Sequence, residues 1–187
     1  MTKVSNRLSR LSESATLAMA QMSRELQAKG IDVISLSLGE PDFDTPEFIK
    51  EAAKKAIDDN FSHYTPVPGL PELRSSISAK FKRDNHLEYT PDQIVVSTGA
   101  KQSLANVCLS LLDPEDEVLL PCPYWVSYAE IIKLAEGVPV EIKSTIDSDF
   151  KITPSQLEAS ITSRTKMIMF SSPCNPSGTV YTQSELE

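Results

Sequence analysis

Short apolar segments alternate with amphipathic segments along the second half of this chain, and this alternation constrains the fold more than any other feature. The predicted strands are 94–97, 117–120, 138–142 and 166–170, and the predicted helices between them are 100–112, 125–135 and 154–161. Strands that alternate with helices are typical of βαβ units and of a sheet covered by helices on both faces. The sequence therefore predicts the α/β fold class.

Residues 1–93 predict mainly helices joined by loops. We expect helices at 15–29, from residue 46 onward, and at 70–83, with one short strand at 33–38. Gly30 ends the first helix, and Thr45 followed by Pro46 is an N-cap with proline at the first helical position. The T-x-x-E pattern at 182–185 is a capping box, yet the chain stops within the turn that it opens. Since a single turn is marginal, we expect a truncated polypeptide.

Charge and cysteine content exclude several classes of protein. The net charge is −8 and the isoelectric point is near 4.9, which argues against a nucleic-acid surface. No apolar run approaches the roughly 18 residues that span a membrane. The three cysteines are widely spaced without metal-ligand pairing, and His63 lies far from His86, so we expect no metal site. A reducing, cytoplasmic location fits such thiols best.

A stiff polar turn follows the last predicted strand. In the segment SSPCNPSG at 171–178, two prolines flank Asn175, and Gly178 supplies a permissive backbone angle. The carboxamide is therefore predicted to be held at the carboxyl end of a strand, where open α/β sheets place ligands. The alternative is that Asn175 serves only the turn.

Two more strand ends carry candidate binding groups. Gly99 lies between a predicted strand and a predicted helix, so the amides that follow it form an anion site or a simple cap. Trp125 follows another strand, where it is a core anchor or a stacking surface for a flat ring. Tyr64, in a Pro-rich loop, is either an exposed phenol or a turn aromatic. Together these groups would suit a phosphorylated planar cofactor, and no nucleotide-binding glycine fingerprint is present.

A series of short motifs resembles the class I and II pyridoxal-phosphate (PLP) aminotransferases, most closely the bacterial aspartate aminotransferase branch. They are GEPDFDTP at 39–46, YTP at 64–66, GLPELR at 69–74, TGAKQ at 98–102, PYW at 123–125 and NPSG at 175–178. The resemblance implies a fold-type-I PLP-dependent transferase with an incomplete three-layer α/β/α large domain. It implies that 1–45 form an N-terminal arm and the start of a small domain, and that 46–187 begin the large PLP-binding domain.

The resemblance also implies roles in binding pyridoxal 5'-phosphate. The amides of Gly99, Ala100 and Lys101 would hold the phosphate, Trp125 would stack on the ring, and Asn175 would hydrogen-bond its phenolic oxygen. Tyr64 would reach the phosphate of a neighbouring subunit, which implies a homodimer.

For the substrates, the resemblance implies an amino acid and a 2-oxo acid. Gly39 would contact the α-carboxylate, Thr16 lies in a segment that would close over the substrate, and Lys101 would contact a distal carboxylate. Trp125 and Asn175 would border the substrate as well. The implied donor is aspartate or glutamate. Members that use prephenate carry a lysine before the segment 14–16, where this chain has Ser12 and Glu13.

None of the lysines present matches the context of the family's Schiff-base lysine, which lies beyond residue 187. We therefore assign no catalytic residue here and expect residues 1–187 alone to be inactive. Two alternatives stay open. One is another fold-type-I PLP enzyme, such as a C–S lyase, a decarboxylase or a synthase. The other is a non-catalytic truncated product that binds a partner.

Overall fold

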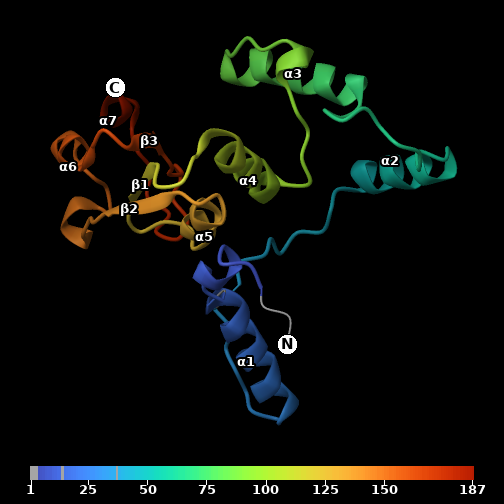
Figure 1. The fold of residues 1–187 in the computed structure, drawn as a ribbon. Helices are drawn as coiled ribbons and strands as arrows, with labels where there is room; N and C mark the ends of the chain where they lie inside the picture. The colour runs from blue at the N-terminus through green and yellow to red at the C-terminus, as the bar shows by residue number, and fades with distance from the viewer. Residues whose placement is uncertain (1–3, 14, 37) are drawn as a thin grey trace. The chain divides into compact units, whose positions relative to one another are not determined.

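The computed structural model describes residues 4–13, 15–36 and 38–187 (Figure 1). The chain forms two compact units, and each is described by itself. The sheet unit comprises Met1–Ala18 and Gly99–Glu187, and the helical unit comprises Met19–Thr98. Helix α1 (Ala15–Ala28) begins in the first unit and ends in the second.

The sheet unit contains a three-stranded parallel sheet with the order β2-β1-β3. The strands are β1 (Glu117–Pro121), β2 (Val138–Ile142) and β3 (Thr165–Ile168), and the helices are α4 (Ala100–Leu111), α5 (Ser127–Leu134), α6 (Pro154–Ser160) and α7 (Gln183–Leu186). Short 3₁₀ turns lie at Leu8–Arg10 and Ile146–Ser148. Because parallel strands need crossover connections, α5 and α6 carry the chain between successive strands.

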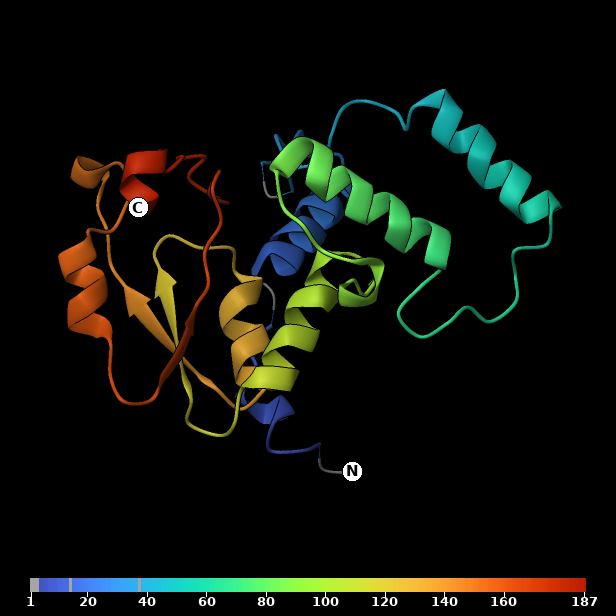
Figure 2. The same cartoon turned by 90° about the horizontal axis from the view of Figure 1, so that it is seen from above.

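The core lies on the central strand. Every residue of β1 is buried, because this strand has a neighbour on each side and side chains against both faces. Val118 and Leu120 point toward α5, where Ile132 is fully buried, while Leu119 alternates to the other face. Helix α5 covers one face and α6 lies on the other (Figure 2). The predicted α/β class is confirmed, and three layers are present.

The helical unit contains the rest of α1, α2 (Glu47–Asp58), α3 (Pro71–Asn85) and a 3₁₀ turn at Pro91–Gln93. Polar contacts bind α3 to the segment after it. The Arg74 guanidinium donates to the carbonyls of Pro91 (2.8 Å) and Ile94 (3.1 Å). Gly69 packs so closely that a Cβ there would lie 2.8 Å from Val96 Cγ2, and its φ of +105° also favours glycine.

The structure corrects two predicted strands. Residues 94–97 are extended but form no strand, because the N–H of Val96 donates to the carbonyl of Pro68 in a loop rather than to a neighbouring strand. In 33–38, residue 37 lies outside the described residues and the others form no strand. Period and apolar character describe one segment, whereas a strand requires a partner. Helix and strand ends elsewhere differ from prediction by one to three residues.

In the ranges that the structure describes, no helix has the length and apolar character needed to cross a lipid bilayer.

Candidate functional site

Helix α4 opens toward free space at its N-terminus. Gly99 is its N-cap with φ of +85°, and a Cβ there would meet no atom within 4 Å. The N–H groups of Gln102 and Ser103 donate to the carbonyl of Gly99 at 3.1 and 3.4 Å. Those of Ala100 and Lys101 lie at the open end of the helix, beyond reach of intrahelical acceptors. With the positive end of the helix dipole, these amides suit an anion.

The structure brings together two of the predicted site residues, Lys101 and Trp125. The Lys101 ammonium lies 4.8 Å from the centroid of the Trp125 ring, over its face. On its other side the indole meets the edge of Tyr128, a core residue, with ring centroids 5.6 Å apart and an interplanar angle of 88°. Trp125 is therefore both half-buried against the core and presented to a cation, so the two alternatives for this tryptophan are compatible.

The turn that carries Asn175 is braced from inside and from a neighbouring loop. The N–H of Gly178 donates to the carbonyl of Cys174 at 2.7 Å, and the N–H of Cys174 donates to the carbonyl of Thr179 at 2.9 Å. The Cys174 thiol donates to the carbonyl of Pro123 at 3.3 Å, which ties this turn to the loop before Trp125. Asn175 itself is exposed. Its carboxamide therefore stands on a closed turn beside the tryptophan loop.

Nearby titratable groups stay uncharged. Burial raises the pKa of the Tyr124 phenol, and its hydrogen bond to Glu141 (2.6 Å) raises it further. Burial also raises the pKa of the Cys122 thiol. Neither group adds a negative charge close to Trp125 at neutral pH, which favours an anionic ligand there.

The remaining predicted residues lie elsewhere in the chain. Tyr64 and Gly39 belong to loops of the helical unit, where Tyr64 is fully exposed and Gly39 has open space around its Cα. Thr16 lies half-buried in the first turn of α1. Ser14, part of the same predicted substrate segment, lies outside the described residues.

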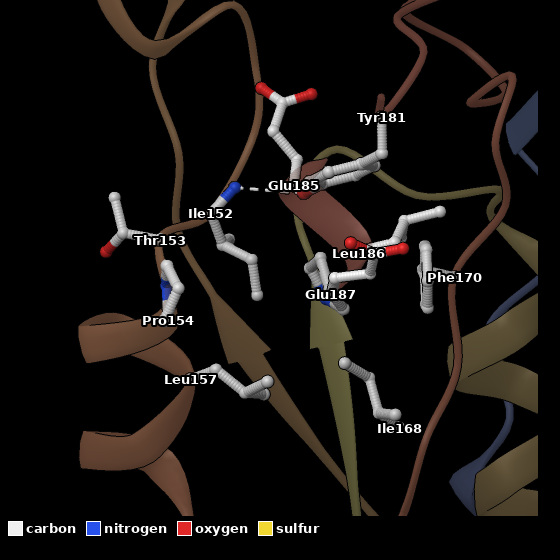
Figure 3. Close-up of a pocket in the computed structure, with 11 residues that line it drawn as sticks. Ile152, Thr153, Pro154, Leu157, Ile168, Phe170, Tyr181, Glu185, Leu186 and Glu187 are labelled. Carbon is white, nitrogen blue, oxygen red and sulfur yellow. Dashed lines mark hydrogen bonds between the residues drawn. The ribbon is translucent and has the colours of Figure 1, made fainter. Parts of the chain in front are cut away.

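An apolar cavity of about 330 Å³ occupies another part of the sheet unit (Figure 3). Its walls include Ile152, Leu157, Ile168 and Phe170, and none of the predicted site residues lines it. Within the described part of the chain, no group of His, Cys, Asp or Glu side chains could hold a metal ion.

The residues of the sheet unit fit a phosphorylated planar cofactor. An open helix N-terminus suits a phosphate, an indole face suits a flat ring, and an exposed carboxamide suits a polar ring substituent. These are the donors that pyridoxal 5'-phosphate requires.

Comparison with known proteins gives the class of this chain. Residues 31–187 match the family model for aminotransferase class I and II, and the chain belongs to that family.

Among the relatives, the chain is 52% identical to an aspartate/prephenate aminotransferase of Cereibacter sphaeroides, covering 100% of this chain and 46% of the relative. It is 50% identical to an aspartate aminotransferase of Bacillus subtilis, covering 98% and 47%. The structure of Thermus thermophilus aspartate aminotransferase with maleate matches with a TM-score of 0.95 and 42% identity, covering 100% of this chain and 49% of that one. The fold is therefore that of the aspartate aminotransferases, and the chain spans about half the length of these relatives.

Proposed function

We propose that the full-length protein transfers an amino group between aspartate or glutamate and a 2-oxo acid, with pyridoxal 5'-phosphate as its cofactor. One observation carries the proposal: the open N-terminus of α4, with Lys101 over the face of Trp125, lies in a chain of the aminotransferase family. When bound, PLP supplies an electron sink for the bonding electrons at the α-carbon of the amino acid.

The chain's own residues hold and orient that cofactor. The amides of Gly99, Ala100 and Lys101 bind the phosphate, where a helix dipole contributes roughly 0.3–1 kcal/mol and up to about 2 when partly buried. Trp125 fixes the plane of the ring and excludes water from one face. The side-chain amide of Asn175 donates a hydrogen bond to the phenolic oxygen, which disfavours protonation at that atom.

Substrate binding would use residues from both units. Lys101 would bind the distal carboxylate of a dicarboxylic substrate, for which its ammonium must leave the face of Trp125 when a flat ring stacks there. Gly39 would contact the α-carboxylate, and Thr16 would border the substrate. We further propose that 1–45 and 46–187 correspond to the arm with the small-domain start and to the large domain.

The remaining catalytic groups and the partner are part of the same proposal. We place the imine-forming lysine outside residues 1–187, so that this segment alone does not transaminate. We propose a homodimer in which Tyr64, fully exposed here, reaches the phosphate bound by the neighbouring subunit.

Prephenate is a second candidate acceptor, and the name of the Cereibacter relative favours it. Ser12 and Glu13 stand where prephenate-using members are expected to carry lysine, so we expect a rate with prephenate well below that with 2-oxoglutarate. Equal rates would reverse this order.

The test is transamination by the full-length protein with aspartate and 2-oxoglutarate, followed as oxaloacetate formation. Trp125→Ala is expected to weaken PLP binding about tenfold, since an aromatic contact contributes about 0.5–1.5 kcal/mol beyond its buried area. The matched control is Tyr89→Phe, which trims a ring outside the site. Release of ammonia, CO₂ or sulfide in place of a keto acid would favour the lyase, decarboxylase or synthase alternatives, and no turnover with any amino donor would overturn the proposal.

The shared site has its own test, in which Tyr64→Ala and Asn175→Ala subunits are mixed. If each site uses both subunits, hybrid dimers regain one intact site and the mixture recovers up to about a quarter of the activity. No recovery above the sum of the two variants would contradict the proposed role of Tyr64.

A further inference from the structure

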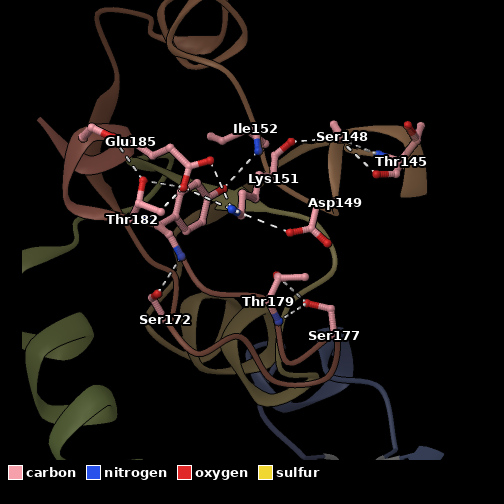
Figure 4. A network of polar contacts seen from close by, with 12 residues as sticks. Thr145, Ser148, Asp149, Lys151, Ile152, Ser172, Ser177, Thr179, Thr182 and Glu185 are labelled. Atoms are coloured by element: carbon pink, nitrogen blue, oxygen red, sulfur yellow. Dashed lines mark hydrogen bonds and ion pairs between the residues drawn. The ribbon is translucent and has the colours of Figure 1, made fainter.

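Tyr181 ties the Asn175 loop to a segment that lies far from it in sequence. We define this loop as residues 171–182. The Tyr181 hydroxyl accepts a hydrogen bond from the N–H of Ile152 at 3.0 Å (Figures 3 and 4). The ring of Tyr181 meets the ring of Phe170, at the end of the last strand segment, edge-on at 5.7 Å. One side chain thus joins the exit of the loop to its entry and to the segment before α6.

The backbone of Tyr181 closes the loop as well. Its N–H donates to Ser172 Oγ at 3.0 Å, so the two ends of the loop are linked directly. Between them, the N–H of Asn175 is directed at Ser171 Oγ, at 3.4 Å. The residue that carries the candidate cofactor contact is therefore held from within a loop whose ends are pinned by a single tyrosine.

A cation supports this tyrosine from behind. The Lys151 ammonium lies 5.8 Å from the centroid of the Tyr181 ring and pairs with Glu185 at 3.0 Å and Asp149 at 3.6 Å (Figure 4). Its side chain is 17% exposed. The hydrogen bond to Glu185 raises the pKa of Lys151, so the cation persists at neutral pH. The ion pair also ties the first turn of α7, just after the loop, to the same segment.

None of these contacts touches the cofactor-binding residues directly. The loop itself has few other restraints, because Asn175 and its neighbours Pro173 and Pro176 are exposed and no strand pairs with them. A carboxamide that donates to one atom of a ring must keep its position to within a few tenths of an ångström, which an exposed loop does not ensure by itself. The contacts of Tyr181 supply that constraint.

We propose that Tyr181, supported by Lys151 and Glu185, is a positioning residue for Asn175: it closes the 171–182 loop and holds the carboxamide against the ring of bound PLP. The inference rests on the proposed function, since it requires that Asn175 contact this cofactor.

The first test compares Tyr181→Phe with the wild type in the full-length protein. This variant keeps the ring and its contacts but removes the acceptor of the Ile152 N–H. We expect faster hydrogen exchange at the amides of Asn175 and Gly178 in the PLP-free protein, by roughly three- to tenfold. Tyr89→Phe is the matched control, since Tyr89 has a similar edge contact with Phe81 (6.1 Å). Unchanged exchange in the 171–182 loop would overturn the inference.

The second test reads the cofactor. We expect Tyr181→Phe to raise the dissociation constant of PLP about two- to tenfold. It should also move the pH midpoint of the absorbance of bound PLP in the same direction as Asn175→Ala, by less. The double variant should show little more than the Asn175→Ala shift, because both changes act through one hydrogen bond.

The outcomes separate the two proposals. Additive shifts in the double variant, or a lower melting temperature with an unchanged pH midpoint, would reduce Tyr181 to a purely structural role and overturn the inference. If the wild-type protein binds no PLP, the proposed function fails first, even where the loop exchanges as expected. Lys151→Met should act like a weaker Tyr181→Phe, with Lys133→Met, which breaks a comparable pair to Glu130 (2.9 Å), as its control.

Discussion

The two units of the chain are held together in different ways. In the sheet unit, all of β1 and four residues of α5 are buried, so apolar burial dominates. In the helical unit, α2 and α3 have no buried residue, and Phe48 and Ile57 on α2 are 76% and 77% exposed. There the α3 segment is held instead by hydrogen bonds from Arg74. Amphipathic sequences formed helices in both units, but only the sheet provided a surface on which an apolar face is buried.

The largest expected effect lies in the apolar core. Ile132→Ala should lower the local free energy of unfolding of the sheet unit by about 2–5 kcal/mol, because Ile132 is fully buried and its removal leaves a cavity. Native-state hydrogen exchange of β1 and α5 in the full-length protein measures this, with Ile132→Val as a milder control. A loss below that of Ile132→Val would show that burial does not dominate this unit.

A smaller loss is expected from the polar anchor of the same sheet. The Thr162 hydroxyl and the Arg164 guanidinium hydrogen-bond the carboxylate of Glu117 and hold its pKa below the usual range. A lowered pKa stabilises the fold above the ordinary value of about 4.3, and this contribution is lost as the pH falls through the lowered pKa. Glu117→Gln should therefore reduce the melting temperature at pH 7, with a difference from wild type that shrinks below about pH 4. A difference independent of pH would refute the assignment.

In the helical unit, the polar contacts should matter most. Arg74→Met keeps much of the aliphatic stem but leaves the carbonyls of Pro91 and Ile94 without their donor, so we expect a loss of about 1–3 kcal/mol confined to α3 and residues 91–96. Hydrogen exchange localises the effect, and Lys82→Met, which breaks an exposed pair with Glu88, is the control. Equal effects of the two variants would remove the contrast between the units.

The smallest effect should come from a single helix cap. The Thr153 hydroxyl accepts from the N–H of Gln156 at 3.2 Å, and the Gln156 side chain accepts from the N–H of Thr153 at 2.9 Å. Thr153→Ala should cost about 1 kcal/mol and increase exchange in α6 only. Thr153→Ser, which keeps the hydroxyl, should behave as wild type, and a loss in Thr153→Ser as large as in Thr153→Ala would argue against the cap.

Local patterns were enough to predict the class of fold, because each of them is decided within a few residues. The alternation after residue 100 predicted helices and strands that the structure confirms, and the T-x-x-E pattern predicted the start of α7. Short motifs were likewise enough to indicate the family, which the family match confirms. The roles of Gly99, Trp125 and Asn175 stay predictions.

Only the tertiary structure decided which segments found partners. Residues 94–97 have the composition of a strand but no neighbour to pair with, so they remain an extended loop. The contact between Lys101 and Trp125, and the way in which Tyr181 joins Ile152 to the Asn175 loop, link residues about 24–29 positions apart. No local pattern encodes such contacts, because they depend on how crossover helices return parallel strands to one sheet and bring their carboxyl ends to the same edge.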